Sequence, residues 1–354
     1  MGILPETENI ANSTIDWSGI HWTQIVWTEP ESAKLMAHEL FHRIQDRLGL
    51  PMSKLSVGAN KHLDTREGRY YMQLEWRGLA RALEAANEAD SRSGIADALL
   101  FRLARYRLFP DAQAQEQALE LNEGLAEYTG VKIGYGSGSG AAQTRAAISD
   151  LNSHKSDPSF SRSFAYATGP AYGLLLDSYA PAWRNEIVKG KTSLAPLLGD
   201  ALKISPPADI EASAKTRATI YNGVALWQDE TARDDKRKDF VHQCESRFVN
   251  GHVLMLPHHH MKTQFDPRNV QTLDNYGVVY QDLRVADDWG VLEVKNGALL
   301  KPDQTVVVEL PTDSPSPLSA RRLTGNGWTL DLSALWDIVP GERAGDYTLR
   351  QRDL

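Results

Sequence analysis

The stretch His38-Glu39-Leu40-Phe41-His42, inside the segment AKLMAHELFHRIQDRLG of residues 33–49, decides which fold this sequence is expected to adopt. On a helix, histidines four residues apart lie on one face, with Cβ atoms about 5–6 Å apart, so both imidazoles can bind one metal ion. Neutral imidazole suits Zn²⁺, at a distance of about 2.0–2.1 Å. Glu39 lies one step round the helix, where it can reach a water molecule instead of the metal. We therefore predict that His38 and His42 are metal ligands and Glu39 a general base.

The context of this motif matters, because HExxH is short and about one or two chains in a hundred contain it by chance. Residues 18–27 predict a strand, and Thr28 to Glu31 form a capping box that starts a helix. The helix should run from about 29 to 48 and end at Gly49. Its apolar side should consist of Leu35, Met36, Leu40, Ile44 and Leu48, and core positions are expected for Trp17, Trp22 and Trp27. A strand followed by a capped amphipathic helix favours a metal site over a chance match.

A catalytic zinc ion needs three protein ligands and an open fourth position. A helix is predicted from Asp111 to Gly130, and on it Glu123 and Glu127 lie four residues apart on one face. The segment NEGLAE at 122–127 resembles the second helix of the gluzincin metallopeptidases, which carries NExxA followed by an acidic residue. These enzymes include thermolysin-like proteases and zinc aminopeptidases. The resemblance implies that Glu123 is the third zinc ligand and that Glu127 accepts the N–H of a ligand histidine. Taken alone, each glutamate reads as an exposed helix carboxylate.

Residues Tyr166-Ala167-Thr168-Gly169 resemble the Tyr-x-x-Gly stretch that follows the zinc-ligand helix in several gluzincins. There a tyrosine hydroxyl binds the oxyanion of the tetrahedral intermediate, and the resemblance implies this catalytic role for Tyr166. A tyrosine in helix packing explains Tyr166 almost as well, and Tyr172 is a rival for the role.

The resemblance covers about residues 20–180 and implies one zinc ion per chain in a zincin-like domain. A bacterial group with HExFHRIQ, LDT-x-x-GR and LNEGLAEYTG is also similar and implies no particular substrate. The Gly-x-Met-Glu-Asn motif of aminopeptidases is absent, which does not favour exopeptidase action. Few residues precede the HExxH helix, so we expect either a small N-terminal sheet or further sequence upstream.

The expected fold class is α+β, with a mainly helical zincin-like domain over 1–249 and a β-rich C-terminal domain over 250–354. Helical patterns cover 68–87, 93–108, 140–153, 163–179 and about 208–248. After residue 250, short apolar runs such as YGVVYQDLRV and QTVVVEL alternate with turn residues, which indicates antiparallel strands. Two domains also fit the length of 354 residues at about 150 residues per domain.

Composition narrows the classes of partner. The net charge is −8, from 38 basic and 46 acidic residues, so the basic footprint of a nucleic-acid binder is missing. No apolar stretch is long enough to predict a membrane span. The single cysteine, Cys244, is expected to be an unreactive, partly buried thiol. The N-terminal residues do not have the pattern of a signal peptide, so the localisation stays open, and a mature or truncated extracytoplasmic bacterial protein is one interpretation. The oligomeric state is not readable from the residues.

Other histidines are weaker candidates. His62 and His154 could line a cleft, although a surface loop is the default, and the run His258 to His260 is interpreted as incidental or structural. The leading hypothesis is a zinc metallopeptidase, an endopeptidase acting on peptide or protein substrates. One alternative is a binding protein that keeps the fold without proteolysis, and another is a zinc hydrolase of a non-peptide carbonyl substrate.

Overall fold

The computed structural model describes residues 12–25, 32–50, 59–136, 138–190, 193–266, 269–273, 275–310 and 320–352. These residues form two compact units that divide between Asp234 and Asp235, within one long helix. The unit before this point is mainly helical and carries a two-stranded sheet, and the unit after it is built largely from antiparallel strands. The α+β class predicted from the sequence is confirmed. Helical structure continues past the division to Asn250, and the first strand of the second unit begins at Val253.

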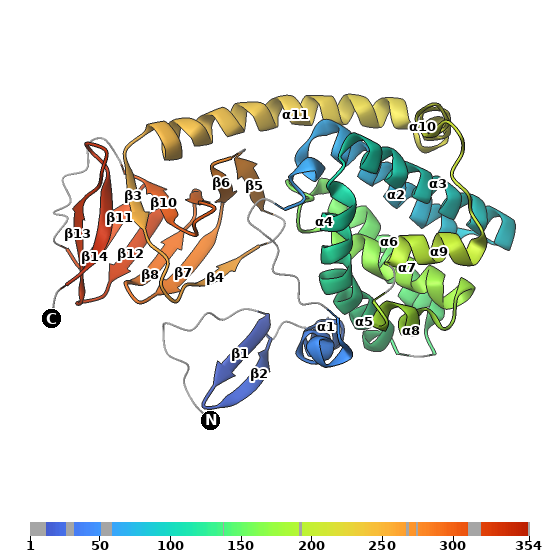
Figure 1. Ribbon diagram of the computed structural model, residues 1–354, viewed down its shortest axis with the longest axis horizontal. Helices are drawn as coiled ribbons and strands as arrows, with labels where there is room; N and C mark the ends of the chain where they lie inside the picture. The colour runs from blue at the N-terminus through green and yellow to red at the C-terminus, as the bar shows by residue number, and fades with distance from the viewer. Residues whose placement is uncertain are drawn as a thin grey trace. The chain divides into compact units, whose positions relative to one another are not determined.

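Most helices lie in the segments in which helical periodicity was predicted, whereas α8 (Trp183–Val188) and α9 (Leu194–Leu202) were not predicted (Figure 1). The predicted helix over 208–248 is interrupted at Asn222, which has a positive φ of 53°. Short 3₁₀ turns are Asp46–Leu48, Lys61–Asp64, His154–Ser156 and Thr219–Tyr221, and π turns are η3 (Glu120–Gly124) and η6 (Ser246–Asn250). The α-helices are α1 (Ser32–Gln45), α2 (Arg66–Glu84), α3 (Glu88–Leu108), α4 (Ala112–Leu119), α5 (Leu125–Gly134), α6 (Gly140–Ser153), α7 (Phe164–Tyr179), α8 (Trp183–Val188), α9 (Leu194–Leu202), α10 (Ile210–Ala218) and α11 (Gly223–Glu245).

The N-terminal sheet is a hairpin of β1 (Ser13–Trp17) and β2 (Ile20–Gln24), where the sequence predicted one strand over 18–27. Ser18 and Gly19 both adopt a positive φ and form the two-residue turn that joins the strands. Trp22 is 48% exposed, so its predicted place in the core is wrong. The capping box at 28–31 and Trp27 lie outside the described residues.

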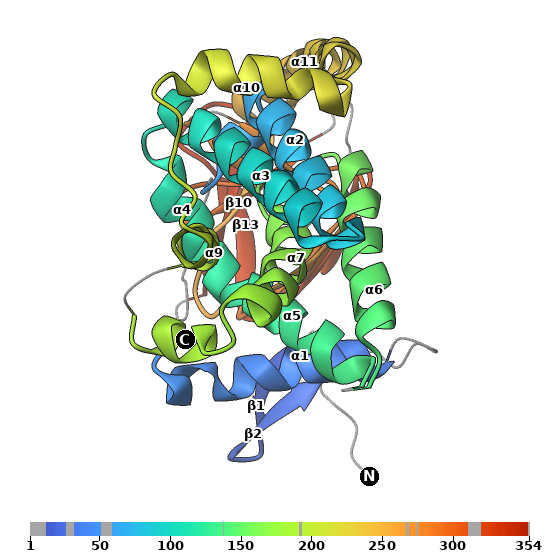
Figure 2. The same ribbon diagram turned by 90° about the vertical axis from the view of Figure 1, so that its right-hand side faces the viewer.

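Helix α1 buries the opposite face from the one that its apolar residues predicted. Met36, Leu40, Ile44 and Leu48 are exposed, whereas His38 and Glu39 are buried. The reason is that α1 packs on α5, beside it in Figure 2, through the side that carries Lys34 and His38. Helix α1 ends at Gln45 and continues as the 3₁₀ turn Asp46–Leu48, and Gly49, in the left-handed conformation, ends the helical segment where the sequence predicted.

Two glycines of α5 explain how closely α1 approaches. A Cβ atom on Gly130 would lie 2.8 Å from the Lys34 carbonyl oxygen, and one on Gly134 would lie 2.6 Å from the Lys34 Cα. Such distances are too short for any side chain larger than hydrogen. Because these glycines are four residues apart, they form one flat strip on α5. The strip brings the backbone of α1 against the helix that carries Glu127.

The π turn η3 connects α4 to α5, contains Glu123 and changes the helical register there. The N–H of Leu125 donates to the carbonyl of Glu120, five residues back, instead of four. A π turn advances each residue by a smaller angle than an α-helix does, so it rotates the residues on its two sides relative to one another. The core around this segment includes Leu119 and Leu125, together with buried residues of α2 and α7.

The second unit is a sandwich of two sheets with the end of α11 on one outer face. The larger sheet has the order β13-β14-β3-β10-β9-β6-β5 and the smaller one β11-β12-β8-β7-β4; all pairs are antiparallel except β14 with β3. Side chains from both sheets share one core, and Cys244 and Phe248 pack on the other face of the larger sheet. The strands are β3 (Val253–Leu256), β4 (Lys262–Phe265), β5 (Val270–Leu273), β6 (Gly277–Tyr280), β7 (Leu283–Asp287), β8 (Gly290–Val294), β9 (Ala298–Leu300), β10 (Val306–Glu309), β11 (Arg322–Gly325), β12 (Trp328–Leu332), β13 (Trp336–Pro340) and β14 (Tyr347–Gln351).

Among the helices of the described residues, none combines the length and the apolar character needed to span a membrane.

Candidate metal centre

His38 and His42 of α1 and Glu123 of η3 converge on one point. The two Nε2 atoms are 3.1 Å apart. The Oε2 atom of Glu123 lies 3.5 Å from Nε2 of His38 and 3.3 Å from Nε2 of His42. In the described part of the chain, this is the one group of at least three histidine, cysteine or acidic side chains arranged to hold a metal ion. The structure therefore brings together the three residues that the sequence proposed as ligands.

The outer nitrogen of each imidazole faces a hydrogen-bond acceptor. Nδ1 of His38 lies 2.7 Å from Oε2 of Glu127, and Nδ1 of His42 lies 3.1 Å from Oε1 of Gln45. A carboxylate or amide oxygen can only accept, so each Nδ1 carries the proton and donates it. In the neutral rings, Nε2 then presents a lone pair to the centre. Two imidazole lone pairs and a carboxylate oxygen at this spacing form a site for a cation.

Lys34 holds the Glu127 carboxylate from the other side. Its Nζ lies 2.6 Å from Oε1 of Glu127 and 3.1 Å from Oδ2 of Asp150 on α6. Burial opposes ionisation of Glu127, but the hydrogen bond to His38 and the charge of Lys34 outweigh it and lower the pKa of Glu127. Glu127 is thus an ionised acceptor at neutral pH, which raises the basicity of the His38 ring.

In the metal-free cluster, protons on the imidazoles offset the negative charge of the glutamates. Burial opposes protonation of His38, but hydrogen bonds to Glu123 and Glu127 outweigh it and raise the pKa of His38 to about 10. Burial likewise opposes ionisation of Glu123, and the two imidazoles hold its pKa well below the usual range. The arrangement therefore favours positive charge at its centre, either as a proton or as a metal cation.

Glu39 is buried beside the ligands and differs from them in its electrostatics. Burial raises its pKa, and the nearby charges of His38 and His42 only partly oppose this effect. Glu39 is 6% exposed, so its carboxylate has lost most of its hydration. A carboxylate with a raised pKa accepts a proton more readily than an ordinary glutamate does, which suits a general base.

Tyr166 of α7 contacts the same cluster. Its ring stacks on the His38 ring with centroids 5.6 Å apart, and its hydroxyl donates to Oε2 of Glu123 over 2.9 Å. Burial and the Glu123 charge raise the pKa of this hydroxyl, so it remains a donor across the physiological range. The rival, Tyr172, instead donates to Glu75 over 2.8 Å within the core. Tyr166 is therefore the tyrosine that the fold brings to the candidate metal centre.

The remaining histidines lie elsewhere. His62 is buried and its Nε2 lies 2.7 Å from Oε1 of Glu116, so the expectation of a surface loop is wrong. His259 and His260 donate their backbone N–H groups to Asp287, which is a structural role.

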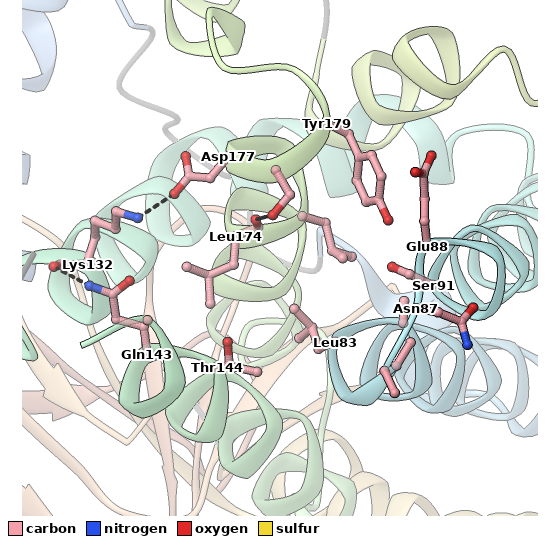
Figure 3. A pocket seen from close by; sticks show the side chains of 16 residues that line it. Leu83, Asn87, Glu88, Ser91, Lys132, Gln143, Thr144, Leu174, Asp177 and Tyr179 are labelled. Atoms are coloured by element: carbon pink, nitrogen blue, oxygen red, sulfur yellow. Dashed lines mark hydrogen bonds and ion pairs between the residues drawn. The ribbon is translucent and has the colours of Figure 1, made fainter. Parts of the chain in front are cut away.

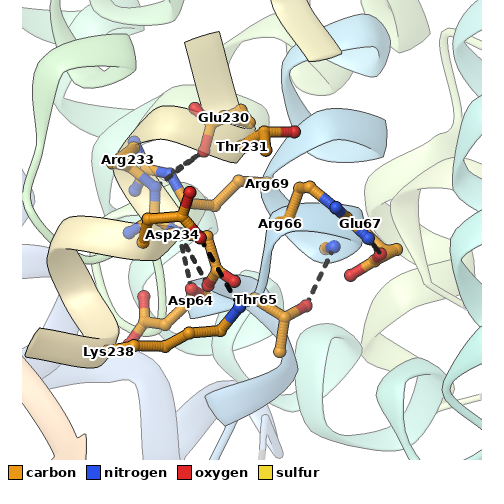
Figure 4. A network of polar contacts seen from close by, with 12 residues as sticks. Asp64, Thr65, Arg66, Glu67, Arg69, Glu230, Thr231, Arg233, Asp234 and Lys238 are labelled. Atoms are coloured by element: carbon orange, nitrogen blue, oxygen red, sulfur yellow. Dashed lines mark hydrogen bonds and ion pairs between the residues drawn. The ribbon is translucent and has the colours of Figure 1, made fainter. Parts of the chain in front are cut away.

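His154 lies beside Tyr166, with ring centroids 6.4 Å apart. Its Nδ1 is 2.7 Å from Asp157. The chain here is held by Arg69, which donates to the Asp157 carbonyl over 3.0 Å and also pairs with Glu230 (Figure 4). The LDT-x-x-GR segment thus positions the loop beside Tyr166.

A cavity of about 550 Å³ lies in the helical unit but contains none of the candidate ligands. Figure 3 shows Lys132, Gln143 and Asp177 among its lining residues, where the ends of several helices meet. Lys132 pairs with Asp177 over 2.7 Å, so these charges are already compensated. The candidate centre is defined by its ligand geometry and not by this cavity.

Lys34 and Gln45 are contacts of the centre that the sequence reasoning missed. Both lie on α1, at spacings of four residues before His38 and three after His42, so they share the ligand face of the helix. Listing the residues three or four positions from each ligand could have found them.

No protein-family model, curated protein or solved structure matches this chain. The case for its chemistry therefore rests on the residues and their geometry.

Proposed function

We propose that the protein is a zinc-dependent hydrolase that cleaves peptide bonds. The observation that carries the proposal is the triangle of ligand atoms, with sides of 3.1, 3.3 and 3.5 Å. Ligands at about 2.0–2.1 Å from a tetrahedral zinc ion lie about 3.3–3.4 Å from one another. The three sides scatter around that value, which supports zinc as the ion that these residues would hold.

The donor set supports a catalytic role. Two histidines and one glutamate leave the fourth position of a tetrahedral ion open, which is typical of catalytic and not of structural zinc sites. When bound, zinc acts as a Lewis acid that lowers the pKa of a bound water towards about 7 and polarises a substrate carbonyl. His38, His42 and Glu123 would hold it.

The other side chains supply the proton transfers and the orientation. Glu39, buried and with a raised pKa, accepts the proton of the attacking water and delivers it to the leaving amine. To Tyr166, protonated and beside Glu123, we assign the hydrogen bond to the oxygen of the scissile carbonyl as it gains charge. Glu127 fixes the His38 ring through Nδ1.

An endopeptidase is the form of this activity that the sequence favours, because the amino-terminus-binding motif of aminopeptidases is absent. The same residues would also hydrolyse an ester or another carbonyl compound, so the substrate class is part of the test.

The test compares the parent protein with Glu39→Gln. Both proteins are purified, their zinc content is measured, and a broad peptide library is digested with and without a chelator. We expect one zinc per chain in both, chelator-sensitive cleavage by the parent, and a loss of at least about 100-fold in the variant, the lower end of general-base effects. Cleavage at the parent rate by Glu39→Gln would overturn the general-base assignment. One zinc per chain with no peptide cleaved would favour a non-peptide substrate or a binding protein.

A further inference from the structure

We propose that Gln45 is a positioning residue of the metal centre, which fixes the His42 ring and joins α1 to the turn that carries Glu123. The inference rests on the proposed metal site and adds a residue that the HExxH and NExxAE motifs do not include.

Gln45 is fully buried at the last position of α1, three residues after His42. Its Oε1 atom lies 3.1 Å from Nδ1 of His42, and its Nε2 atom donates to the carbonyl of Leu121 over 3.4 Å. Both ends of one amide are therefore used, and each end reaches a different ligand-bearing segment.

The first contact sets the His42 tautomer. Because the amide oxygen only accepts, Nδ1 of His42 must donate, and Nε2 is left as a lone pair facing the centre. Glu127 does the same for His38 with a charged acceptor. Gln45 fixes the tautomer of His42 without adding a negative charge to a cluster that already contains Glu39, Glu123 and Glu127.

The second contact acts on the π turn η3. Leu121 lies within η3, two residues before Glu123. At the start of the turn, Glu120 is buried and accepts from Arg102 over 2.8 Å. The π turn lets Glu120 face this arginine while Glu123 faces the imidazoles, and Gln45 holds the turn from the α1 side. Loss of the amide should therefore misplace both a ligand ring and a ligand carboxylate.

Gln143 provides a matched control. It is also a buried glutamine of the helical unit, and its Nε2 donates to the carbonyls of Lys132 and Gly136 over 3.1 and 2.8 Å (Figure 3). None of its hydrogen bonds reaches a ligand residue. Replacing it by methionine removes the same chemistry from a site with no link to the metal.

The experiment measures zinc affinity by competition with a chromophoric chelator, and thermal unfolding of the metal-free proteins. Gln45→Met should weaken zinc binding about 10- to 100-fold, the usual effect of losing a partner of a ligand histidine. Gln45→Glu keeps an acceptor for His42 but loses the donor to Leu121, so its zinc affinity should fall between those of the parent and Gln45→Met. Gln143→Met should bind zinc as the parent does, even if its unfolding temperature falls as far as that of Gln45→Met.

Equal zinc affinity for Gln45→Met and Gln143→Met would overturn the proposal and leave Gln45 a packing residue. If Gln45→Met does not fold, Gln45→Glu decides, and a zinc affinity equal to that of the parent in that variant would overturn the proposal. A parent protein that binds no zinc would instead contradict the proposed function, so the two failures are distinguishable.

Discussion

Replacing Glu127 by glutamine tests whether the cluster is a metal site or only a set of buried ion pairs. Glu127 contacts His38 Nδ1 over 2.7 Å and Lys34 Nζ over 2.6 Å. Glutamine keeps an acceptor in the same place but removes the charge, and charge-assisted hydrogen bonds are about twice as strong as neutral ones. Lys34 retains Asp150 as a partner, at 3.1 Å, so the lysine is not left uncompensated.

From these contacts we expect Glu127→Gln to weaken zinc binding about 10-fold, or about 1.4 kcal/mol, and Glu127→Ala about 100-fold. Isothermal titration of the metal-free proteins measures the affinity, and Glu88→Gln is the control. Glu88 is 71% exposed and pairs only loosely with Arg92, at 3.8 Å. The reasoning is refuted if Glu127→Gln and Glu127→Ala both bind zinc as tightly as the control.

Three further outcomes are expected. First, because the pKa of His38 is raised to about 10, zinc binding at pH 7.5 should release a proton. The released proton makes the measured enthalpy of zinc binding depend on the ionisation enthalpy of the buffer. A binding enthalpy that is the same in all buffers would contradict this prediction. Second, burial raises the pKa of the Cys244 thiol from 9.0 to about 11. At pH 8, iodoacetamide should therefore label Cys244 at least about 100-fold more slowly in the native protein than in the unfolded protein. Equal labelling rates would refute the burial argument. Third, burial opposes ionisation of Glu116, but Arg105 outweighs this effect and lowers the pKa of Glu116 from 4.5 to about 2. The ionised carboxylate therefore stabilises the fold above pH 4.5, and this stabilisation, on the order of 3 kcal/mol, is lost as the pH falls towards 2. A free energy of unfolding in urea that stays constant from pH 5 to 3 would count against this prediction.

The candidate ligands could be predicted because a spacing of four on a helix fixes direction. His38 and His42 share a face wherever α1 lies, and the same holds for Glu123 and Glu127 along the second helix. Residue spacing alone did not predict that the two helices contact one another. That prediction followed from the resemblance of NEGLAE to a known pattern, and in the structure the contact depends on Gly130 and Gly134.

Features set by tertiary contacts were not predictable from local patterns. Within the π turn at Glu120–Gly124, Glu120 pairs with a buried arginine, and no local residue preference predicts this contact. His62 was assigned to a surface loop because its neighbours are polar, yet the partner that buries it, Glu116, is 54 residues away. The sequence pattern predicted the wrong buried face for α1, because its apolar residues form the clearer stripe along the helix. Buried polar clusters reverse the usual rule that the apolar face of a helix is the buried one.

The most direct measurement is anomalous X-ray diffraction from crystals of the zinc-loaded protein, recorded on both sides of the zinc absorption edge. The account predicts one peak per chain, about 2.0–2.2 Å from Nε2 of His38, Nε2 of His42 and a carboxylate oxygen of Glu123. A peak elsewhere, for example at His258 to His260, or no peak at full zinc loading, would contradict the account.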